Sequence, residues 1–291
     1  MTTIPFDKRD GEIWMDGVFV PWQEAKVHVL SHGLHYASSV FEGLRVYGGK
    51  IFKLQEHSQR LHRSAELLDM VIPYSVEVLN EACREAVVRN GMSNGYIRPV
   101  AWSGSEMMAI SASQNTVHVA VAAWEWGSYF DPAIKANGLK LKTSTWRRPS
   151  PETAPCASKA AGLYMICTMS KHQAERDGFH DALMLDWRGY IAEATGANIF
   201  LVMNSGEIHT PLADCFLDGI TRRTVIELAK NAGYTVVERR IEPAELANAA
   251  EVFLTGTAAE ITPVGSIDAY HFTVGDVTKR MIADYSALTL A

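Results

Sequence analysis

The chain has 291 residues, of which 47% are hydrophobic and 21% are charged, and its formal net charge is −6. This composition is typical of a globular protein and excludes a disordered or collagen-like chain. No basic tail or stripe supplies the concentrated positive charge that nucleic acid or an anionic membrane requires, so we expect neither partner.

The N-terminal segment lacks the apolar core of a signal peptide, and the longest apolar run, at 119–124, is too short to span a bilayer. The four cysteines, Cys83, Cys156, Cys167 and Cys215, show no C-x-x-C spacing. Their number and spacing favour free, core-filling thiols over a disulfide framework. We therefore expect a cytoplasmic protein.

Turn residues predict two β-hairpins in the first part of the chain. One covers 13–20 with Asp-Gly at its turn, and the other covers 44–52 with Gly-Gly. Apolar periodicity then predicts two helices and two strands, at 55–69, 76–90, 95–102 and 117–124. The segment 127–138 has a proline, two flanking glycines and little periodicity, which favours a linker.

Strands and helices alternate irregularly after this segment. Strands are predicted at 139–146, 182–187, 198–203, 206–210, 234–241 and 251–255, and helices at 159–177, at 220–232 and from about 274. The mixture indicates packed layers of an α+β or α/β protein. We predict an N-terminal α/β domain at 1–126, an interdomain loop at 127–138 and a C-terminal domain at 139–291.

Several common catalytic motifs are absent from the sequence. It contains no P-loop, no G-x-G-x-x-G, no H-E-x-x-H and no G-x-S-x-G. His32 and His35 have a spacing that metal ligands use, but no third ligand follows at a convincing distance. We therefore predict packing or hydrogen-bonding histidines and no metal site.

Small and apolar residues surround Lys159. An apolar wall lowers the pKa of a lysine, and Schiff-base chemistry requires the neutral amine. On composition alone, a lysine at a helix start that reaches solvent is the more common case, because lysines are seldom fully buried.

Three further segments suit anionic ligands. Leu217-Asp-Gly-Ile-Thr221-Arg leads into a predicted helix, whose first N–H groups can bind a phosphate, and 255–260 has the small residues of a second phosphate loop. Tyr96 and Arg98 share one face of a strand, where the guanidinium could bind a carboxylate. A capped helix, a plain turn and a surface strand are the structural alternatives.

Taken together, these segments resemble the class IV pyridoxal-phosphate aminotransferases, and most closely their bacterial branched-chain amino-acid group. The likeness extends from about residue 12 to the C-terminus. The matching blocks are Ser31-His-Gly-Leu-His-Tyr36, Val40-Phe-Glu-Gly-Leu-Arg45, His57-Ser-Gln-Arg60-Leu, Tyr96-Ile-Arg98-Pro, Ser158-Lys159-x-x-Gly-x-Tyr164, Glu193-Ala-Thr-Gly196-Ala-Asn198-Ile-Phe, Leu217-x-Gly-Ile-Thr221-Arg and Gly256-Thr-Ala-Ala-Glu-Ile-Thr-Pro263.

The resemblance implies a two-domain fold of the D-amino-acid-aminotransferase type, called fold type IV. Its N-terminal domain would be α/β, and its larger C-terminal domain would contain a barrel-like sheet. The implied cofactor is pyridoxal 5′-phosphate. The implied assembly is a homodimer at minimum, with a trimer of dimers as the open alternative.

The resemblance also implies the cofactor-binding residues. Lys159 would form a Schiff base with the cofactor and move a proton between the substrate α-carbon and the cofactor. Glu193 would pair with the pyridine nitrogen, and Tyr164 would hydrogen-bond the phenolate oxygen. The phosphate would be held by Arg60, by the backbone of Ile220 and Thr221, and by Thr257, while Leu217 and Gly196 would lie close to the cofactor.

The implied reaction is transamination between leucine, isoleucine or valine and 2-oxoglutarate. Apolar walls would suit the branched side chain, and a cation or polar donors would suit the second carboxylate. The implied substrate-binding residues are Phe41, Tyr96, Arg98, Trp126, Tyr129 and Ala258, together with Tyr36 from a partner subunit.

Other activities on the same scaffold remain open. They are D-amino-acid transamination, (R)-amine transamination and the aminodeoxychorismate lyase reaction, besides a cofactor-binding protein without turnover. Tyr96 and Arg98 favour the branched-chain reaction, because they would serve a carboxylate-bearing substrate. The stretch 103–110 departs from the Gly-richer form of the family, which leaves the substrate range open. The sequence does not rank leucine, isoleucine and valine as substrates.

Overall fold

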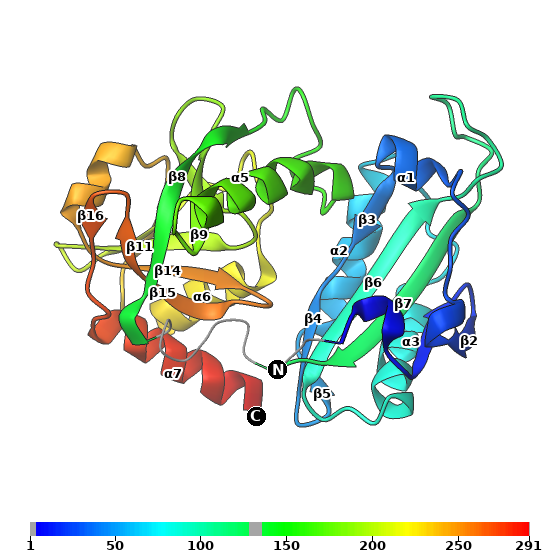
Figure 1. The fold of residues 1–291 in the computed structure, drawn as a ribbon. Coiled ribbons are helices and arrows are strands. Elements are labelled where there is room, and N and C mark those ends of the chain that lie inside the picture. The colour runs from blue at the N-terminus through cyan, green and yellow to red at the C-terminus, as the bar shows by residue number, and fades with distance from the viewer. Residues whose placement is uncertain (1–3, 128–135, 291) are drawn as a thin grey trace. The chain divides into compact units, whose positions relative to one another are not determined.

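The computed structural model describes residues 4–127 and 136–290, which form two compact units (Figure 1). The first unit comprises residues 1–127 with 158–162, and the second comprises 128–157 with 163–291. Most of the predicted interdomain loop, residues 128–135, lies outside the described residues.

The first unit is built around one antiparallel sheet. Within its described residues the strands are β1 (Glu12–Met15), β2 (Val18–Pro21), β3 (Ser39–Phe41), β4 (Leu44–Tyr47), β5 (Lys50–Ile51), β6 (Gly95–Ser103) and β7 (Val117–Glu125). The helices are α1 (His32–Tyr36), α2 (Leu54–Glu66) and α3 (Val76–Arg89), with short 3-10 helices η1 (Phe6–Lys8) and η2 (Trp22–Glu24).

The strand order of this sheet is β2-β1-β7-β6-β4-β5, and β3 pairs with β6. Helices α2 and α3 pack against the sheet, where Leu61 and Leu79 join Val40, Ile97 and Val119 in one buried apolar core. The core explains why apolar residues recur at helical spacing in these two segments and at alternate positions in the strands.

Both hairpins predicted from turn residues are present. Asp16 and Gly17 have φ values of 49° and 96°, and Gly48 and Gly49 have values of 54° and 80°. Positive φ at both central residues matches the twist of a two-residue hairpin, and glycine adopts it without steric cost. The local turn chemistry therefore determined these elements.

The second unit contains a larger sheet. Within its described residues the strands are β8 (Leu139–Arg148), β9 (Asp181–Asp186), β10 (Ile191–Ala194), β11 (Asn198–Met203), β12 (Ile208–Pro211), β13 (Val236–Arg239), β14 (Ala249–Gly256), β15 (Glu260–Ile267) and β16 (Tyr270–His271). The helices are α5 (Met165–Arg176), α6 (Ile220–Asn231) and α7 (Asp276–Leu290), with the 3-10 helix η4 (Pro243–Asn248).

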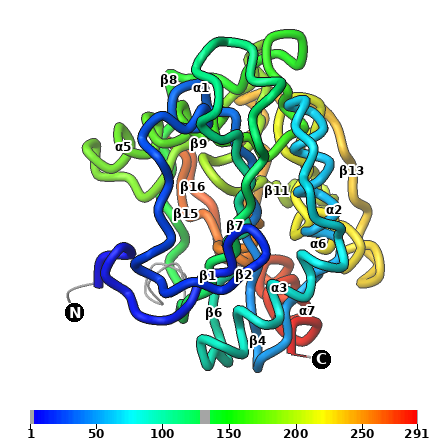
Figure 2. Tube along the Cα trace, turned by 90° about the vertical axis from the view of Figure 1, so that its right-hand side faces the viewer, coloured from blue at the N-terminus to red at the C-terminus, as the bar shows by residue number. Residues whose placement is uncertain are grey.

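Six of these strands close into a barrel. The order is β10-β9-β8-β15-β14-β11, and an additional pairing between β10 and β11 closes the ring. Strand β8 runs parallel to β9 and β15, beside which it lies in Figure 2. Leu139, Leu183, Ile199, Leu254 and Val264 fill the core. The predicted barrel-like sheet is thus confirmed.

The predicted helix at 159–177 begins later than expected. A 3-10 helix, η3, covers Ala161–Tyr164, the α-helix starts at Met165, and Lys159 precedes both. The reason is that the backbone N–H and C=O of Lys159 bond to Ser64 and Phe41, so they are not available to a helix. The sequence pattern also missed the short strands β3, β10 and β16 and the longer β15.

All four cysteines are buried free thiols, as predicted. Among the described residues, no helix is both long enough and apolar enough to cross a membrane.

Candidate active site

Lys159 lies in the segment 158–162, which packs within the first unit. The Phe41 N–H donates to the Lys159 carbonyl at 3.2 Å, and the Lys159 N–H donates to Ser64 Oγ at 3.0 Å. The Ser158 hydroxyl donates to the Ser64 carbonyl at 2.9 Å, and Val40 forms a β-bridge with Ala160. Residues 40–41 and helix α2 therefore hold the main chain of the predicted catalytic lysine.

The surroundings of Lys159 shift the protonation equilibrium of its amine toward the neutral form. Burial is the largest cause that lowers its pKa from 10.5 to about 8. The positive charges of Arg60 and Arg98 lower the pKa as well, whereas the negative charge of Glu42 raises it. At pH 7 about a tenth of such an amine is neutral, far more than for a lysine in water.

Glu42 joins Arg60 and His57 in a buried cluster next to this lysine. Its carboxylate accepts from Arg60 Nε at 2.6 Å and from Arg60 Nη2 at 2.9 Å, and it accepts from His57 Nδ1 at 2.6 Å. Burial alone would raise the pKa of Glu42, but the charges and hydrogen bonds of Arg60 and His57 outweigh it and hold the pKa below its usual 4.5. Burial lowers the pKa of His57, despite the opposing effect of Glu42. The histidine is therefore neutral, and its Nδ1 carries the proton that it donates.

Tyr96 and Arg98 lie on the same face of β6, as their spacing predicts. Arg98 Nη2 is 3.4 Å from the Tyr96 hydroxyl. The ring of Phe41 has Arg98 Cζ at 4.7 Å and Lys159 Nζ at 4.9 Å from its centre. Trp126 meets Tyr96 edge to face, with ring centres 4.7 Å apart. The first unit therefore brings these five predicted site residues together.

Tyr36 is not among the residues of this group. Tyr36 is 44% exposed at the end of α1, where its ring packs on His32. Tyr129 lies outside the described residues. His32 bonds to the Ser38 hydroxyl and the Ala109 carbonyl, each at 2.9 Å, which agrees with the predicted hydrogen-bonding role.

Glu193 has buried polar neighbours in the second unit. It lies on β10, where its carboxylate is 3.3 Å from Arg148 Nε and accepts from Asn198 Nδ2 at 3.1 Å. Arg148 Nη1 also approaches the Leu163 carbonyl at 3.2 Å and Cys167 Sγ at 3.3 Å. Burial is the largest effect on the pKa of Arg148 and lowers it, but the electrostatic effects of Glu193, Cys167, Tyr164 and Cys156 together outweigh it and raise the pKa. Glu193 is thus held as an oriented carboxylate.

Asn198 links Glu193 to the start of helix α6. The same Nδ2 group donates to the Leu217 carbonyl at 3.0 Å. Gly219 lies so close that a Cβ atom there would be 2.2 Å from Asn198 Oδ1. Only glycine therefore permits this approach of the loop. Gly219 is the N-cap of α6 without a side-chain cap, so the first turn, with Ile220 and Thr221, has N–H groups for an anion.

The turn after β14 lies beside the segment that joins β10 to β11. At the end of β14, a Cβ atom on Gly256 would be 3.4 Å from the Gly196 carbonyl oxygen and 3.5 Å from Ala197. Thr257 and Ala258 follow in the turn before β15. A Cβ atom on Gly196 itself would meet open space. The predicted cofactor residues Glu193, Gly196, Leu217, Ile220, Thr221 and Thr257 therefore occupy three neighbouring loops and strand ends of this unit.

Five residues of the site had no role predicted from the sequence. They are Glu42, His57, Ser64, Arg148 and Asn198. Glu42, His57 and Asn198 fall inside the quoted sequence blocks, but nothing in the pattern shows that they are buried against charged partners. On α2, the spacing of three and four between His57, Arg60 and Ser64 places them on one face. A polar face on a helix normally indicates solvent, so this signal pointed the wrong way.

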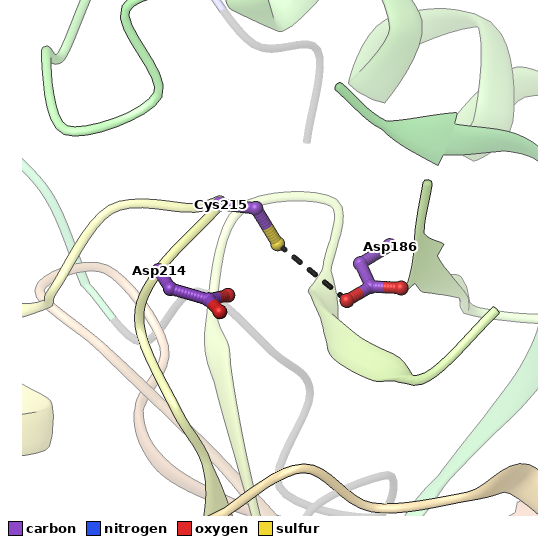
Figure 3. A group of neighbouring side chains, drawn as sticks. All are labelled: Asp186, Asp214 and Cys215. Carbon is purple, nitrogen blue, oxygen red and sulfur yellow. Dashed lines mark hydrogen bonds between the residues drawn. The ribbon is translucent and has the colours of Figure 1, made fainter. Parts of the chain in front are cut away.

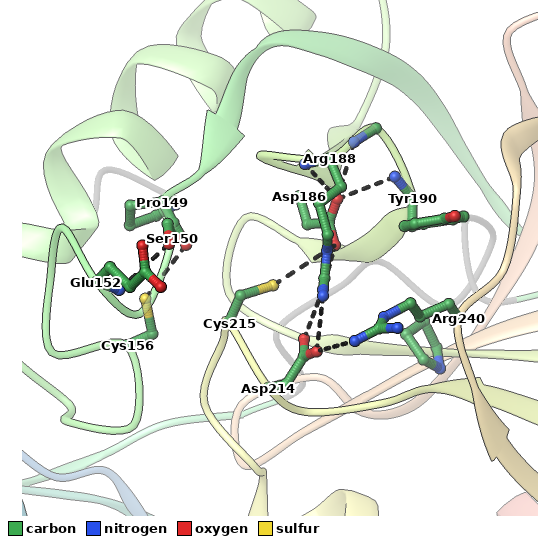
Figure 4. A network of polar contacts seen from close by, with 12 residues as sticks. Pro149, Ser150, Glu152, Cys156, Asp186, Arg188, Tyr190, Asp214, Cys215 and Arg240 are labelled. Atoms are coloured by element: carbon green, nitrogen blue, oxygen red, sulfur yellow. Dashed lines mark hydrogen bonds and ion pairs between the residues drawn. The ribbon is translucent and has the colours of Figure 1, made fainter.

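A separate cluster of the second unit has the composition of a metal site. Ligand atoms of Asp186, Asp214 and Cys215 lie within 4.8 Å of one another (Figure 3). However, Arg188 lies between the two carboxylates and bonds both, through Nε to Asp186 at 2.8 Å and through Nη2 to Asp214 at 2.8 Å (Figure 4). Arg188, together with Arg240 at 3.3 Å from Asp214, balances the two negative charges, so we interpret this cluster as an ion-pair network.

This network anchors the loop that leads to α6. Asp186 Oδ1 accepts the backbone N–H groups of residues 188, 189 and 190 at 2.8 to 3.0 Å, which closes the turn after β9. Asp214 binds Arg188 and, at 3.3 Å, Arg240. Because Asp214 precedes Leu217 by three residues, the network fixes the approach of the chain to the N-terminus of α6.

Comparison with known proteins places this arrangement in a family. Residues 39–267 match the model of the family described as amino-transferase class IV. The branched-chain-amino-acid aminotransferase of Pseudomonas aeruginosa is 43% identical over 284 residues, covering 95% of this chain and 92% of the relative. The Escherichia coli enzyme of the same name is 39% identical over 282 residues, covering 94% and 91%.

Solved structures show the same likeness. The T.th. branched-chain amino acid aminotransferase, solved with pyridoxamine 5′-phosphate, superimposes with a TM-score of 0.93 at 43% identity, covering 97% of this chain and 95% of that chain. A complex described under the same protein name with N-(5′-phosphopyridoxyl)-L-glutamate has a TM-score of 0.92 at 42% identity and the same coverage. The chain belongs to the class IV aminotransferases, the family of pyridoxal-phosphate-dependent transaminases that its sequence resembles.

Proposed function

We propose that the protein transfers the amino group of branched-chain L-amino acids to 2-oxoglutarate, with pyridoxal 5′-phosphate as its cofactor. The curated relatives of this name match nearly the whole chain. The T.th. structures hold pyridoxamine 5′-phosphate and a phosphopyridoxyl-glutamate adduct. A glutamate adduct in a structural neighbour supports 2-oxoglutarate as the amino acceptor here.

The residues of each unit fit this cofactor. In the first unit, the amine of Lys159 has a pKa of about 8, close to physiological pH. In the second unit, Glu193 offers an oriented carboxylate for a ring nitrogen, and α6 begins without a side-chain cap. The open space beside Gly196 leaves room for a planar ring. These features suit an aldehyde, a pyridine nitrogen and a phosphate group in turn.

Lys159 is the proposed acid and base of the reaction. When bound, pyridoxal phosphate supplies an electron sink for the bonding electrons of the substrate α-carbon. The neutral Nζ of Lys159 can then accept the proton from the substrate α-carbon and return it at a nearby atom. An amine with a pKa of about 8 suits both directions, because general acid–base catalysis is most effective with a pKa near the working pH.

The other proposed contacts hold charge in place. Glu193 would keep a proton on the ring nitrogen, and Tyr164 would donate to the phenolate oxygen. Arg60 would bind the phosphate together with Thr257 and the backbone of Ile220 and Thr221. The N–H groups at a helix start favour an anion through both hydrogen bonds and the helix dipole.

The observation that carries the substrate class is the environment of Phe41. Its ring lies within 5 Å of both Lys159 Nζ and Arg98 Cζ. An apolar surface for a branched side chain thus adjoins both the reacting amine and a cation for a carboxylate. Tyr96 adds a hydroxyl that can donate to the same carboxylate.

Incubation with defined substrate pairs tests the proposal. L-leucine, D-alanine and (R)-1-phenylethylamine are each offered with 2-oxoglutarate or pyruvate, and product formation is followed by chromatography. We expect L-leucine with 2-oxoglutarate to react fastest. Lys159→Ala should lower its rate on the order of 10²–10⁴-fold or more, because the proton carrier is removed. Dominant activity on D-alanine or on the amine would contradict the proposal.

We also propose that the protein works as a homodimer. In this dimer, Tyr36 of one subunit would contribute to the active site of the other subunit. A hollow of about 330 Å³ in the first unit is lined mostly by apolar side chains, including Ile13, Val27 and Leu34, and also by Ser39 and Arg98. Leu34 is 63% exposed and Val29 is 70% exposed. An exposed apolar patch of this kind favours association with a second copy.

Light scattering during gel filtration tests the assembly. Leu34→Glu should shift the protein toward the monomer, because a charge would then have to be buried at the interface. Val88→Glu, at an exposed position on α3 away from the hollow, is the matched control and should not change the mass. A wild-type protein that elutes as a monomer would contradict the dimer. A trimer of dimers and a cytoplasmic location stay predictions.

A further inference from the structure

Helix α2 has a buried polar face in the first unit. His57, Arg60 and Ser64 are spaced by three and four residues, so their side chains share one face of the helix. Ser64 holds the backbone of Lys159, while Arg60 and His57 bond to Glu42. One face of one helix therefore connects the proposed phosphate ligand with the proposed catalytic lysine.

Glu42 and Arg60 form a bidentate ion pair. Glu42 is fully buried, and its two oxygens accept from Nε and Nη2 of the same guanidinium at 2.6 and 2.9 Å. Two parallel hydrogen bonds fix the plane of the guanidinium as well as its position. A long, flexible arginine side chain would otherwise lose this order to rotamer entropy.

Glu42 is itself held on a third side. His57 Nδ1 donates to Oε2 at 2.6 Å, and the backbone N–H of Gly43 lies 3.2 Å from the same oxygen. His57 is 2% exposed, so water does not compete for this bond. The carboxylate therefore cannot rotate away from Arg60 without breaking a buried, charge-assisted hydrogen bond.

The ion pair of Glu42 and Arg60 also has an electrostatic effect on the neighbouring basic groups. The positive charges of Arg60 and Arg98 both act on the amine of Lys159 and lower its pKa. Glu42 is the anion among them, and it opposes their mutual repulsion. Removal of Glu42 would remove two of the hydrogen bonds that orient the guanidinium of Arg60.

We propose that Glu42, braced by His57, is a positioning residue that fixes the guanidinium of Arg60 for the phosphate group of the cofactor. This inference rests on the proposed role of Arg60 in phosphate binding. Glu42 does not touch the reacting atoms in this scheme. Its proposed effect on ligand affinity acts through Arg60 at the phosphate end of the ligand, which distinguishes it from a general contribution to the stability of the fold.

Comparison of pyridoxal phosphate with pyridoxal, which lacks the phosphate, tests the proposal on the apoenzyme. Glu42→Gln keeps the shape of the side chain but replaces an accepting oxygen with a donor that cannot bond to Arg60. We expect the affinity for pyridoxal phosphate, measured by absorbance titration, to fall about ten- to a hundredfold. The affinity for pyridoxal should stay within about twofold. Equal losses for both ligands, or no loss, would overturn the proposal.

Two further variants separate this claim from the role of Arg60. Arg60→Lys should also lower the affinity for pyridoxal phosphate more than the affinity for pyridoxal. The double variant Glu42→Gln/Arg60→Lys should lose no more affinity for pyridoxal phosphate than Arg60→Lys alone. If Arg60→Lys shows no phosphate-dependent loss, both the proposed role of Arg60 and this inference fail. If Arg60→Lys shows it and Glu42→Gln does not, only this inference fails. In either case the substrate assay still tests the transaminase activity independently.

A control and a second pair of variants keep the test decisive. Glu251→Gln converts another buried carboxylate, which accepts from the backbone of residue 278 at 2.8 Å, and should leave both affinities unchanged. If Glu42→Gln does not fold, His57→Leu and His57→Asn replace it. The asparagine amide can donate near the position of Nδ1, so His57→Asn should retain the preference for pyridoxal phosphate and His57→Leu should lose much of it. Equal behaviour of the two His57 variants would overturn the proposal.

Discussion

Lys159 differs from an ordinary lysine because the first unit acts on its amine in two ways. Burial disfavours the charged form, and the guanidinium groups of Arg60 and Arg98 repel it. Glu42 opposes them but does not outweigh them. The balance leaves an amine that gains and loses a proton near physiological pH, as proton transfer to and from carbon requires.

This balance predicts the pH dependence of Lys159 reactivity. In the apoenzyme, the rate of amine modification at Lys159, followed by peptide mass spectrometry, should rise with pH and be half-maximal near pH 8. In the chain unfolded by denaturant, the midpoint should move to about 10.4. Because the unfolded state binds more protons between these two values, the free energy of unfolding should also rise with pH across this window. A midpoint above pH 10 in the folded apoenzyme would contradict the account.

The sequence could propose Lys159, Glu193 and Tyr164 as site residues because each stands in a recognisable block. It could not name Arg148, whose ion pair with Glu193 depends on how the closed barrel brings the end of β8 near β10, two strands away. Glu42 stood inside a quoted block, but its burial follows from its pairing with α2. A residue's partners come from the fold, whereas its type comes from the sequence.

At the scale of elements, the connection between α2 and the segment 158–162 is the most consequential. Ser64 and Lys159 are 95 residues apart in sequence, and their hydrogen bond joins a helix to an irregular segment. Local patterns predicted the hairpin at Asp16-Gly17 and the helix that ends before Gly91, because their signals lie within the element. They placed Lys159 at a helix start, because the bonds that prevent a helix there are long-range.

Replacement of Ser64 tests this connection. Ser64→Ala removes the acceptor for the buried Lys159 N–H, and an unsatisfied buried donor costs about 1–3 kcal/mol. We expect the free energy of unfolding to fall by that amount in urea titrations, and kcat to fall with little change in the affinity for pyridoxal. Ser58→Ala, a buried serine on the same helix, is the control. Equal effects of the two variants on the free energy of unfolding and on kcat would show that the hydrogen bond from Lys159 to Ser64 is not what matters.

At the scale of the whole molecule, the two units divide the proposed work. The first holds the reacting amine, the apolar ring of Phe41 and the cations for carboxylate and phosphate. The second holds the carboxylate for the ring nitrogen and the helix start for the phosphate. The family resemblance predicted the barrel, whereas the apolar pattern missed two of its strands, β10 and β15. The inclusion of 158–162 in the first unit could not be predicted, because it depends on backbone bonds to Phe41 and Ser64.

Borohydride reduction of the pyridoxal-phosphate-loaded enzyme, followed by peptide mapping, is the most direct test of the central claim. The account predicts a phosphopyridoxyl group on Lys159 and on no other lysine, and loss of this label when L-leucine is added first. A protein that gains no visible absorbance with pyridoxal phosphate, or a label that maps to another lysine, would contradict it.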